Sequence, residues 1–227
     1  MLKTGLFYEN TLLSHLNDIV PKDGYALDCG ANIGTHSVFF SGVMGLKTIA
    51  FEPIEKNRIL LQEAIIQNDL QDLVSIEPVA LGDQEGTVHL SAPDPNNPGT
   101  FQITQGGEET ASVVVLDNFL EHVTSPIRLI KIDVEGFEAS VMRGGINTIA
   151  KHKPCIVAEL PSYAELAEVK SILAPHCYVA VDLFNATPTI VFLNTQENSI
   201  SWIDRLRNHW RIRRKYKKYE QKLAAQA

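Results

Sequence analysis

The chain contains 227 residues, 44% of them hydrophobic and 21% charged, with a formal net charge of −7. This length suits one domain with a single well-buried core, and no apolar run approaches the roughly 20 residues of a membrane span. Residues 1–200 carry 11 Lys and Arg against 25 Asp and Glu. This acidic body argues against a broad nucleic-acid surface, which needs clustered cations.

The N-terminus and the cysteines indicate the compartment. Residues 1–10 lack the apolar core and the small-residue cleavage site of a signal peptide. Cys29, Cys155 and Cys177 lie in or beside apolar segments, without a Cys-x-x-Cys pair or a histidine at zinc-binding spacing. We therefore expect buried thiols in a reducing cytoplasm.

A nucleotide-binding turn follows the first apolar strand. That strand stops at Asp28, and the next strand ends at Glu52. Between them the chain enters a helix through Gly30, Asn32 and Gly34. This succession is typical of a nucleotide-binding βαβ unit, in which the second acid holds ribose hydroxyls. An ordinary strand-to-helix turn is the alternative, and the two acids at matching positions disfavour it.

The charge of this turn distinguishes two classes of cofactor. In dinucleotide sites a pyrophosphate lies over the turn and the helix N-terminus, where the carboxylate of Asp28 would repel it. S-adenosylmethionine has no phosphate and carries a sulfonium and an ammonium, so Asp28 would attract it directly or through water. Asn32 also stands where the G-x-G-x-x-G dinucleotide pattern requires glycine. The turn therefore favours S-adenosylmethionine over NAD.

Apolar strand-like runs alternate with helix-like runs along most of the chain, a pattern typical of a parallel sheet covered on both faces. The expected helices cover 9–17, 34–43, 54–68, 138–149 and 163–173. The expected strands cover 25–28, 47–52, 74–79, 128–133, 154–159, 178–182 and 189–193. We predict an α/β fold with a doubly wound, Rossmann-like sheet of seven mostly parallel strands.

The segment 82–115 interrupts this alternation. Two short strands are expected over 87–91 and 112–115, around a loop over 92–99 that is rich in Pro, Asn and Gly. An insertion after the third strand lies at the carboxyl edge of the sheet, where open α/β folds bind ligands. We expect a β-hairpin insertion that forms either a substrate-side flap or an inert surface hairpin.

The last segment is basic. Residues 201–227 carry 9 Lys and Arg against 2 Asp and Glu, and apolar residues recur at spacings of three and four over 201–223. We expect a C-terminal basic amphipathic helix, and we divide the chain into a domain over 1–198 and a tail over 199–227. Such a helix can pack on its own acidic domain, bind a partner, or lie peripherally on an anionic membrane.

Four motifs, in order, make the chain resemble an FkbM-type methyltransferase of class I. They are Leu27-Asp28-Cys29-Gly30-Ala31-Asn32-Ile33-Gly34, Ala50-Phe51-Glu52-Pro53, Ala80-Leu81-Gly82 and Lys131-Ile132-Asp133-Val134-Glu135-Gly136-Phe137-Glu138. Only Cys29 departs from the family's common opening, and the basic tail lies outside the match. The resemblance implies S-adenosylmethionine-dependent methylation of a hydroxyl on a sugar, a glycan or another small metabolite. It implies cofactor contacts from Glu9, Asp28, Gly30, Asn32, Gly34, Glu52, Pro53, Ala80 and Asp133.

Methyl transfer needs alignment of the acceptor and removal of its proton, because a sulfonium is already a good leaving group. Asp133 and Glu135 follow the fourth strand, and Glu159 ends the fifth. We expect Asp133 and Glu135 to contact the acceptor or the methionine amine, and Glu159 to act as general base or substrate contact. Crowded carboxylates raise at least one pKa or recruit a cation, so Mg²⁺ held by Asp133 and Glu159 is the alternative.

Four further residues have two interpretations each. His36 is expected to contact the acceptor, unless it only caps its helix or is solvated. Asp83 is expected to accept from the adenine amino group, unless it is a turn acid. Lys131 is a paired structural lysine or a functional one, and Glu138 fits a helix N-terminal acid better than a catalytic one. Two other functional classes stay open, an NAD-binding oxidoreductase and a cofactor-binding interaction protein without catalysis.

Overall fold

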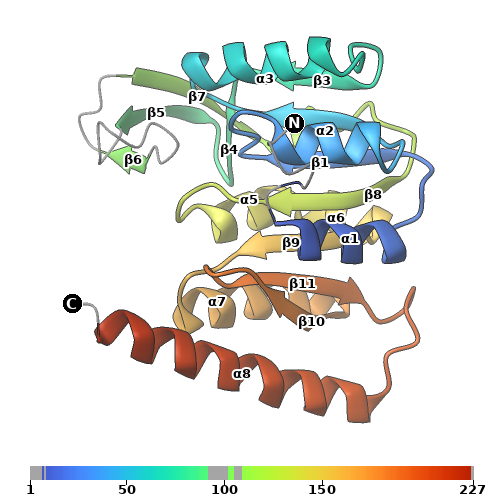
Figure 1. Cartoon of the computed structure of the whole chain (residues 1–227), viewed down its shortest axis with the longest axis vertical. Coiled ribbons are helices and arrows are strands. Elements are labelled where there is room, and N and C mark those ends of the chain that lie inside the picture. The colour runs from blue at the N-terminus through green and yellow to red at the C-terminus, as the bar shows by residue number, and fades with distance from the viewer. Residues whose placement is uncertain (1–6, 8, 92–101, 105–108, 226–227) are drawn as a thin grey trace.

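A computed structural model describes the chain at residue 7 and over 9–91, 102–104 and 109–225. Its main element is a seven-stranded sheet in the order β10-β11-β9-β8-β1-β2-β3 (Figure 1). The strands are β1 (Tyr25–Cys29), β2 (Lys47–Phe51), β3 (Val74–Glu77), β8 (Ile127–Ile132), β9 (Cys155–Glu159), β10 (Tyr178–Phe184) and β11 (Thr189–Asn194). Strand β11 is antiparallel to both neighbours, and the other pairings in this sheet are parallel. The predicted α/β fold with seven mostly parallel strands is confirmed.

Helices cover both faces of this sheet (Figure 1). One face carries α1 (Asn10–Ile19), α2 (Thr35–Gly42) and α3 (Glu55–Gln67). The other face carries α5 (Glu138–Gly144), α6 (Ile146–His152) and α7 (Tyr163–Leu173), and the short α4 (Leu116–Phe119) precedes β8. A 3-10 turn over Ala174–His176 leads into β10. The sheet is therefore doubly wound, and the chain changes faces at the boundary between β1 and β8.

The prediction of one helix over 138–149 was wrong, because the helix is interrupted at Gly145. A Cβ on Gly144 would lie 2.0 Å from the carbonyl oxygen of Gly82, and one on Gly145 would lie 2.7 Å from Cδ2 of Leu116. The glycine pair therefore lets neighbouring segments approach the backbone closely, and the chain continues as α6 after a local break.

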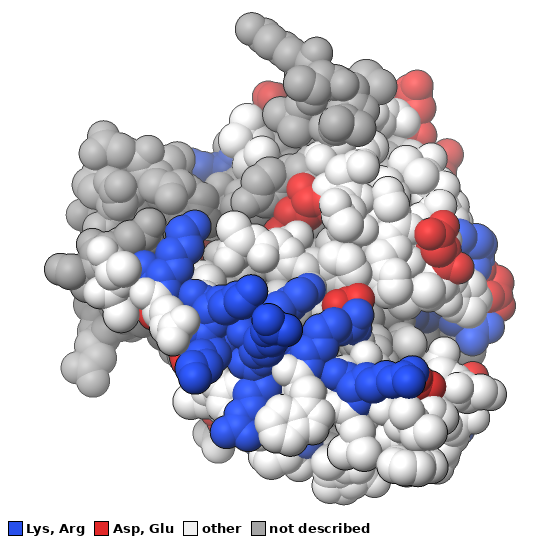
Figure 2. Space-filling model, turned by 60° about the horizontal axis from the view of Figure 1, so that its bottom comes forward, with Lys and Arg blue, Asp and Glu red and all other residues white. Residues whose placement is uncertain are grey.

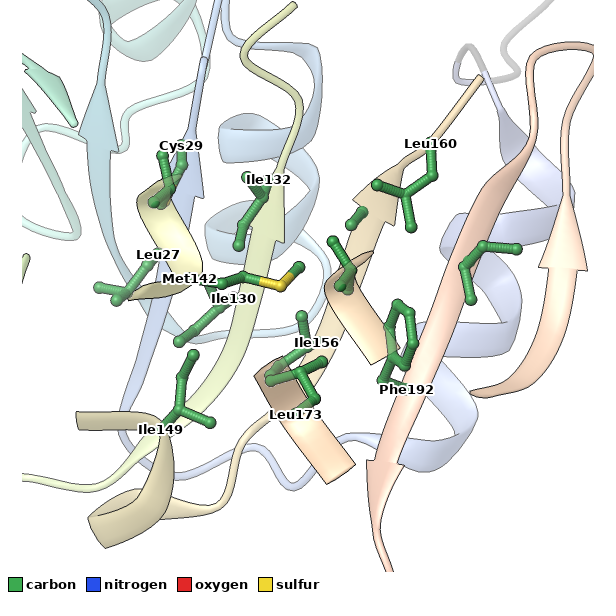
Figure 3. Packing of buried hydrophobic residues seen from close by; sticks show 14 of the residues in the cluster. Leu27, Cys29, Ile130, Ile132, Met142, Ile149, Ile156, Leu160, Leu173 and Phe192 are labelled. Carbon is green, nitrogen blue, oxygen red and sulfur yellow. The ribbon is translucent and has the colours of Figure 1, made fainter. Parts of the chain in front are cut away.

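Side chains that alternate along the strands divide the core between the two faces. Leu27 and Cys29 of β1 and Ile130 and Ile132 of β8 point to the face of α5, α6 and α7 (Figure 3). They pack there with Met142, Ile149, Ile156, Leu160, Leu173 and Phe192. Because of this alternation, the intervening polar residues Asp28 and Lys131 lie on the face that α2 covers.

The predicted insertion forms a second sheet in the order β4-β7-β5-β6. Its strands are β4 (Ala80–Gly82), β5 (Gly86–Ser91), β6 (Gln102–Thr104) and β7 (Glu109–Val115). Strands β5 and β7 pair antiparallel, as a hairpin requires, and β4 and β6 extend the sheet beyond the prediction. The loop predicted over 92–99 lies outside the described residues.

The predicted basic helix is α8 (Trp202–Ala224), which lies along β10 (Figure 1). Ile212 and Tyr216 are buried in the main core, and the Tyr216 hydroxyl donates to the carbonyl oxygen of Leu160 at 2.7 Å. The helix is therefore packed on the sheet through a narrow apolar face. No helix in the described ranges is both long and apolar enough to cross a bilayer. The boundary at residue 198 stays a prediction.

Gly34 allows α2 and α3 to pack closely. It has φ +89°, and a Cβ there would lie 2.3 Å from Cδ1 of Leu61. We expect Gly34→Ala to lower the free energy of unfolding by about 2–4 kcal/mol, from backbone strain plus overpacking. Gly45 is the matched control, because it has φ +73° with open space around a Cβ, so Gly45→Ala should cost about 1–2 kcal/mol. Urea unfolding would measure both, and equal losses would contradict the packing role of Gly34.

Candidate active site

The glycine turn lies at the carboxyl end of β1, between β2 and β8. The backbone amides of Gly30 and Ala31 both donate to the carbonyl oxygen of Phe51 at 3.0 Å, which holds the turn against β2. The amide of Asp133 donates to the carbonyl oxygen of Cys29 at 3.0 Å. Since the chain changes faces here, the turn lies at the position where open α/β sheets bind ligands.

The two predicted glycines of the turn have different roles. Gly30 has φ +79°, and a Cβ there would lie 1.9 Å from the carbonyl oxygen of Asp133. Only glycine fits, because the turn and the end of β8 approach this closely. Gly34 instead lies at the N-terminus of α2 and contacts Leu61 of α3, away from the pocket described next.

A pocket opens over the turn. The predicted cofactor residues that line it are Gly30, Asn32, Glu52, Pro53, Ala80 and Asp133. The rest of its lining is mostly apolar and comprises Phe51, Ile54, Asn57, Val79, Leu81, Leu90, Val134, Glu135 and Phe137. Sequence patterns identified Glu135 but not the apolar residues, because nothing distinguishes them from core positions. Leu90 belongs to β5, so the second sheet supplies one wall. Apolar walls beside a buried carboxylate suit an adenosine group.

Glu52 both lines the pocket and fixes the turn. Its side chain accepts from the backbone amide of Asn32 at 2.8 Å, from the amide of Ile54 at 2.9 Å and from Nδ2 of Asn57 at 3.3 Å. Burial raises the pKa of Glu52, and the hydrogen bonds from Ile54 and Asn32 counteract that rise. The carboxylate is therefore oriented before any ligand binds.

Asp28 lies beneath the turn and is fully buried, outside the residues that line the pocket. It is the register partner of Lys131 on β8. Nζ of Lys131 lies 3.2 Å from Oδ1 of Asp28 and 3.5 Å from Oδ2 of Asp133, and it donates to the carbonyl oxygen of Gly30 at 2.7 Å. Ser37 donates to the other oxygen of Asp28 at 2.6 Å. Asp28 therefore supports the turn from below.

Both Asp28 and Lys131 are charged at neutral pH. Burial opposes ionisation of Asp28, but Lys131, His36 and Ser37 outweigh it and lower the pKa of the carboxyl group. Burial also opposes the charge on Lys131, but Asp28 and Asp133 outweigh it and raise the pKa of the amine. Of the two interpretations of Lys131, the contacts support the paired structural lysine.

A second cavity adjoins the pocket, and Asp133 and Glu135 line both. The lining of this acidic cavity consists of Asp133, Glu135, Gly136, Glu138, Glu159, Pro161 and Glu165. The structure thus brings together the three predicted catalytic acids. This follows from topology, because neighbouring parallel strands end at the same edge of the sheet.

Glu138 holds the loop between β8 and α5. Glu135 and Gly136 have φ +54° and +100°, so this loop leaves the ordinary backbone regions. Glu138 is buried and accepts from the backbone amides of Val134 at 3.1 Å and Gly136 at 3.2 Å. Glu138 is the first residue of α5, as expected. By holding the loop, it also positions Asp133 and Glu135.

Glu159 has a pKa near neutrality. Burial raises its pKa to about 7, Asp133, Glu135 and Glu9 add to the rise, and Lys131 opposes it. Burial also raises the pKa of Glu135, with Asp133 contributing. A base is most effective when its pKa lies near the working pH, so Glu159 suits proton removal.

His36 and Glu9 form a separate pair beside the acidic cavity. Nε2 of His36 lies 3.0 Å from Oε2 of Glu9, and the other oxygen of Glu9 accepts from Nδ2 of Asn185 at 2.6 Å. Asn185 also donates to Thr189, the register partner of Glu159. Neither His36 nor Glu9 lines the pocket or the acidic cavity. Asn185 was missed by sequence analysis, because a polar residue in a turn carries no signal of a distant partner.

Asp83 lies outside the lining of both cavities. It accepts from the hydroxyl of Ser140 at 2.8 Å and lies 3.1 Å from Nε of Arg143. These contacts lower the pKa of Asp83 and join the end of β4 to α5. A contact with adenine would require Asp83 to leave both partners.

The magnesium alternative has no support in the described part of the chain. No group of three or more His, Cys, Asp or Glu side chains is placed there to hold a metal ion.

The fold and the site define a Rossmann-like methyltransferase. A profile of the methyltransferase FkbM domain matches residues 28–178, and the chain belongs to this family. Family membership confirms the resemblance and implies S-adenosylmethionine as the methyl donor. It excludes the alternative class, an NAD-binding oxidoreductase. The pocket fits that donor, because its described lining contains Glu52, Asp133 and Glu135 but no Lys or Arg to bind a pyrophosphate.

Known proteins show the same relationship. The chain is 26% identical to methyltransferase sdnD of Sordaria araneosa in an alignment that covers 63% of this chain and 69% of that protein. It resembles the crystal structure of methyltransferase FkbM from Methylobacillus flagellatus KT with a TM-score of 0.57 and 20% identity, over 76% of this chain but 44% of that one. An rRNA methylase from Streptococcus thermophilus matches with a TM-score of 0.51 and 12% identity, over 86% and 98% of the two chains. At this low sequence identity, the two structures show only that the fold is shared.

The Asp28–Lys131 pair gives a stability prediction. Lys131→Met leaves Asp28 buried without its cation, and we expect a loss of about 3–5 kcal/mol in the free energy of unfolding at pH 7. Without Lys131 the pKa of Asp28 rises, so the loss should shrink as the pH falls toward about 4 and the carboxyl group becomes neutral.

Two further variants test the cause by urea unfolding across pH. Adding Asp28→Asn to Lys131→Met should recover most of the loss, because no buried charge remains. Lys153→Met breaks a more exposed pair with Glu197 and should cost at most about 1 kcal/mol. If the double variant were no more stable than Lys131→Met, the loss of stability would not come from leaving the charge of Asp28 unpaired.

Proposed function

We propose that this protein transfers the methyl group of S-adenosylmethionine to a hydroxyl group of a sugar, a glycan or another small metabolite. The observation that carries the proposal is the acidic cavity beside the cofactor pocket, where the pKa of Glu159 is about 7. A hydroxyl must lose its proton as the methyl group is transferred, and a carboxylate with this pKa can accept that proton at neutral pH.

Each part of the site has a task in this reaction. Glu52 would hold the ribose hydroxyls, and the apolar walls of the pocket would enclose the adenine. Asp133 and Glu135, at the wall shared with the acidic cavity, would attract the cationic end of the donor. The donor supplies an electrophilic methyl group on a good leaving group, so the chain must only align the acceptor and remove its proton.

The charge of the acidic cavity also favours one class of acceptor. The same fold serves an rRNA methylase, so the fold leaves the acceptor open. Five carboxyl groups line the cavity, and they would repel the phosphates of a nucleic acid brought to the methyl group. An acceptor with neutral hydroxyls meets no such repulsion.

The role of Glu159 predicts a pH dependence. Below its pKa the group is protonated and cannot act as a base, so kcat/KM should rise with pH through an apparent pKa of about 7. Glu159→Gln should lower kcat by about 10²–10⁴-fold and remove this rise. Glu63→Gln removes an exposed carboxylate on α3 and serves as the control. A variant at Glu159 that kept both the rate and the pH profile would exclude it as the base.

The reaction itself is tested in two steps. Calorimetry should show binding of S-adenosylhomocysteine and none of NAD. A donor with a ¹³C-labelled methyl group is then incubated with extracts separated into glycan, lipid and small-metabolite fractions, and the products are examined by NMR. We expect a methoxy signal. A labelled methyl group on nitrogen or carbon would refute hydroxyl methylation while leaving the methyltransferase activity in place.

A further inference from the structure

Helix α8 uses only one side to pack on the domain. Ile212 and Tyr216 are buried, whereas Ile203, Leu206 and Trp210 on the opposite side are 44%, 51% and 64% exposed. Trp202, in the first turn, is 70% exposed. We define the outward face of α8 as Trp202, Ile203, Leu206, Arg207, Trp210, Arg213, Arg214 and Lys217. Large apolar side chains grouped on a surface in this way indicate an interaction site.

The outward face is also strongly basic. Lys and Arg side chains gather over α8, with few acidic ones near them (Figure 2). Arg214 and Lys217 make no ion pair within the described part of the chain, and the guanidinium of Arg213 lies 5.9 Å from the centre of the Trp210 ring. The positive charge of this face is therefore available to a partner.

From these two observations we infer that the outward face of α8 docks the protein on a membrane surface that contains anionic lipids. Such a surface offers negative headgroups and, a few ångströms below them, an apolar layer for Ile203, Leu206 and the indole rings. Tryptophan rings favour this boundary, and the long stems of Lys and Arg reach the headgroups from it.

Two other occupants fit the face less well. A nucleic acid offers phosphates and stacking surfaces, but no apolar layer for Ile203 and Leu206. A second copy of the face would present the same cations and repel the first. The anionic bilayer matches both the charge and the apolar side chains.

The charge of the remaining chain sets the orientation on the membrane. Residues 1–200 carry 25 acidic against 11 basic residues, so only the α8 side is attracted to a negative surface. A groove lined by Lys215, Lys218 and Tyr219 leads from α8 to Glu9 and Asn185, beside the acidic cavity. The docked protein therefore holds this groove close to the membrane surface. The inference stands independently of the acceptor proposed above.

The chain contains a built-in probe for this binding. It has two tryptophans, and both lie on the outward face of α8, so tryptophan emission reports on this face alone. The full chain is mixed with phosphatidylcholine vesicles, with or without roughly one third phosphatidylglycerol. We expect a blue shift of the emission and co-sedimentation with the anionic vesicles only, both weakened by high salt. No shift and no sedimentation would overturn the inference.

Variants separate the outward face from general charge. Arg213→Gln, Arg214→Gln and Lys217→Gln together should lower partitioning into anionic vesicles about 100-fold. Lys47→Gln, Lys56→Gln and Lys151→Gln remove three exposed cations elsewhere and should change it less than threefold. Ile203→Ser with Leu206→Ser should weaken binding about tenfold and abolish most of the blue shift.

Three controls test whether the outward face binds a membrane rather than a nucleic acid or a second copy. They are thermal unfolding of the variants, addition of an RNA oligonucleotide without vesicles, and a raised protein concentration without vesicles. Thermal unfolding should be unchanged in these variants, because every substituted side chain is exposed. Equal losses in the two charge triplets would overturn the inference. So would a tryptophan shift produced without vesicles, either by an RNA oligonucleotide or by raising the protein concentration alone, because the face would then serve a nucleic acid or a second copy.

Discussion

The buried ion pair between Asp28 and Lys131 is the contact on which the site depends. One ammonium group reaches the carboxylate at the end of β1, the carbonyl oxygen of Gly30 in the cofactor turn, and the carboxylate of Asp133 in the acidic loop. Removing two charges from water costs several kcal/mol for each ion, so the pair is a poor source of stability alone. We interpret the pair as the contact that fixes the position of the glycine turn relative to the loop between β8 and α5.

The same lysine balances the charge of the acidic cavity. Burial and neighbouring carboxylates raise the pKa of Glu159 and of Glu135, and Lys131 counteracts the rise in both cases. The pKa of Glu159 is about 7 as the net result. A buried cation beneath several acids thus keeps one of them close to the pH at which a base is useful.

Helix α8 adds a second charged feature, which lies along β10. The FkbM domain profile ends at residue 178, so β11 and α8 lie beyond it. Even so, Ile212 and Tyr216 are part of the main core, and Arg211 and Lys215 donate to the carbonyl oxygens of Val181 and Leu183 in β10. This addition is integrated into the domain, which leaves its outward face free for another role.

The sequence by itself determined the α/β class, the seven strands, the cofactor turn and the convergence of Asp133, Glu135 and Glu159. These features depend on local hydrophobic patterns and on the rule that parallel strands end at one edge. Only the tertiary structure decided that Lys131 faces Asp28, that Asn185 holds Glu9, and which apolar residues line the pocket. Strand register, contacts between distant segments and burial decide these features, and all three arise only when the whole chain is packed.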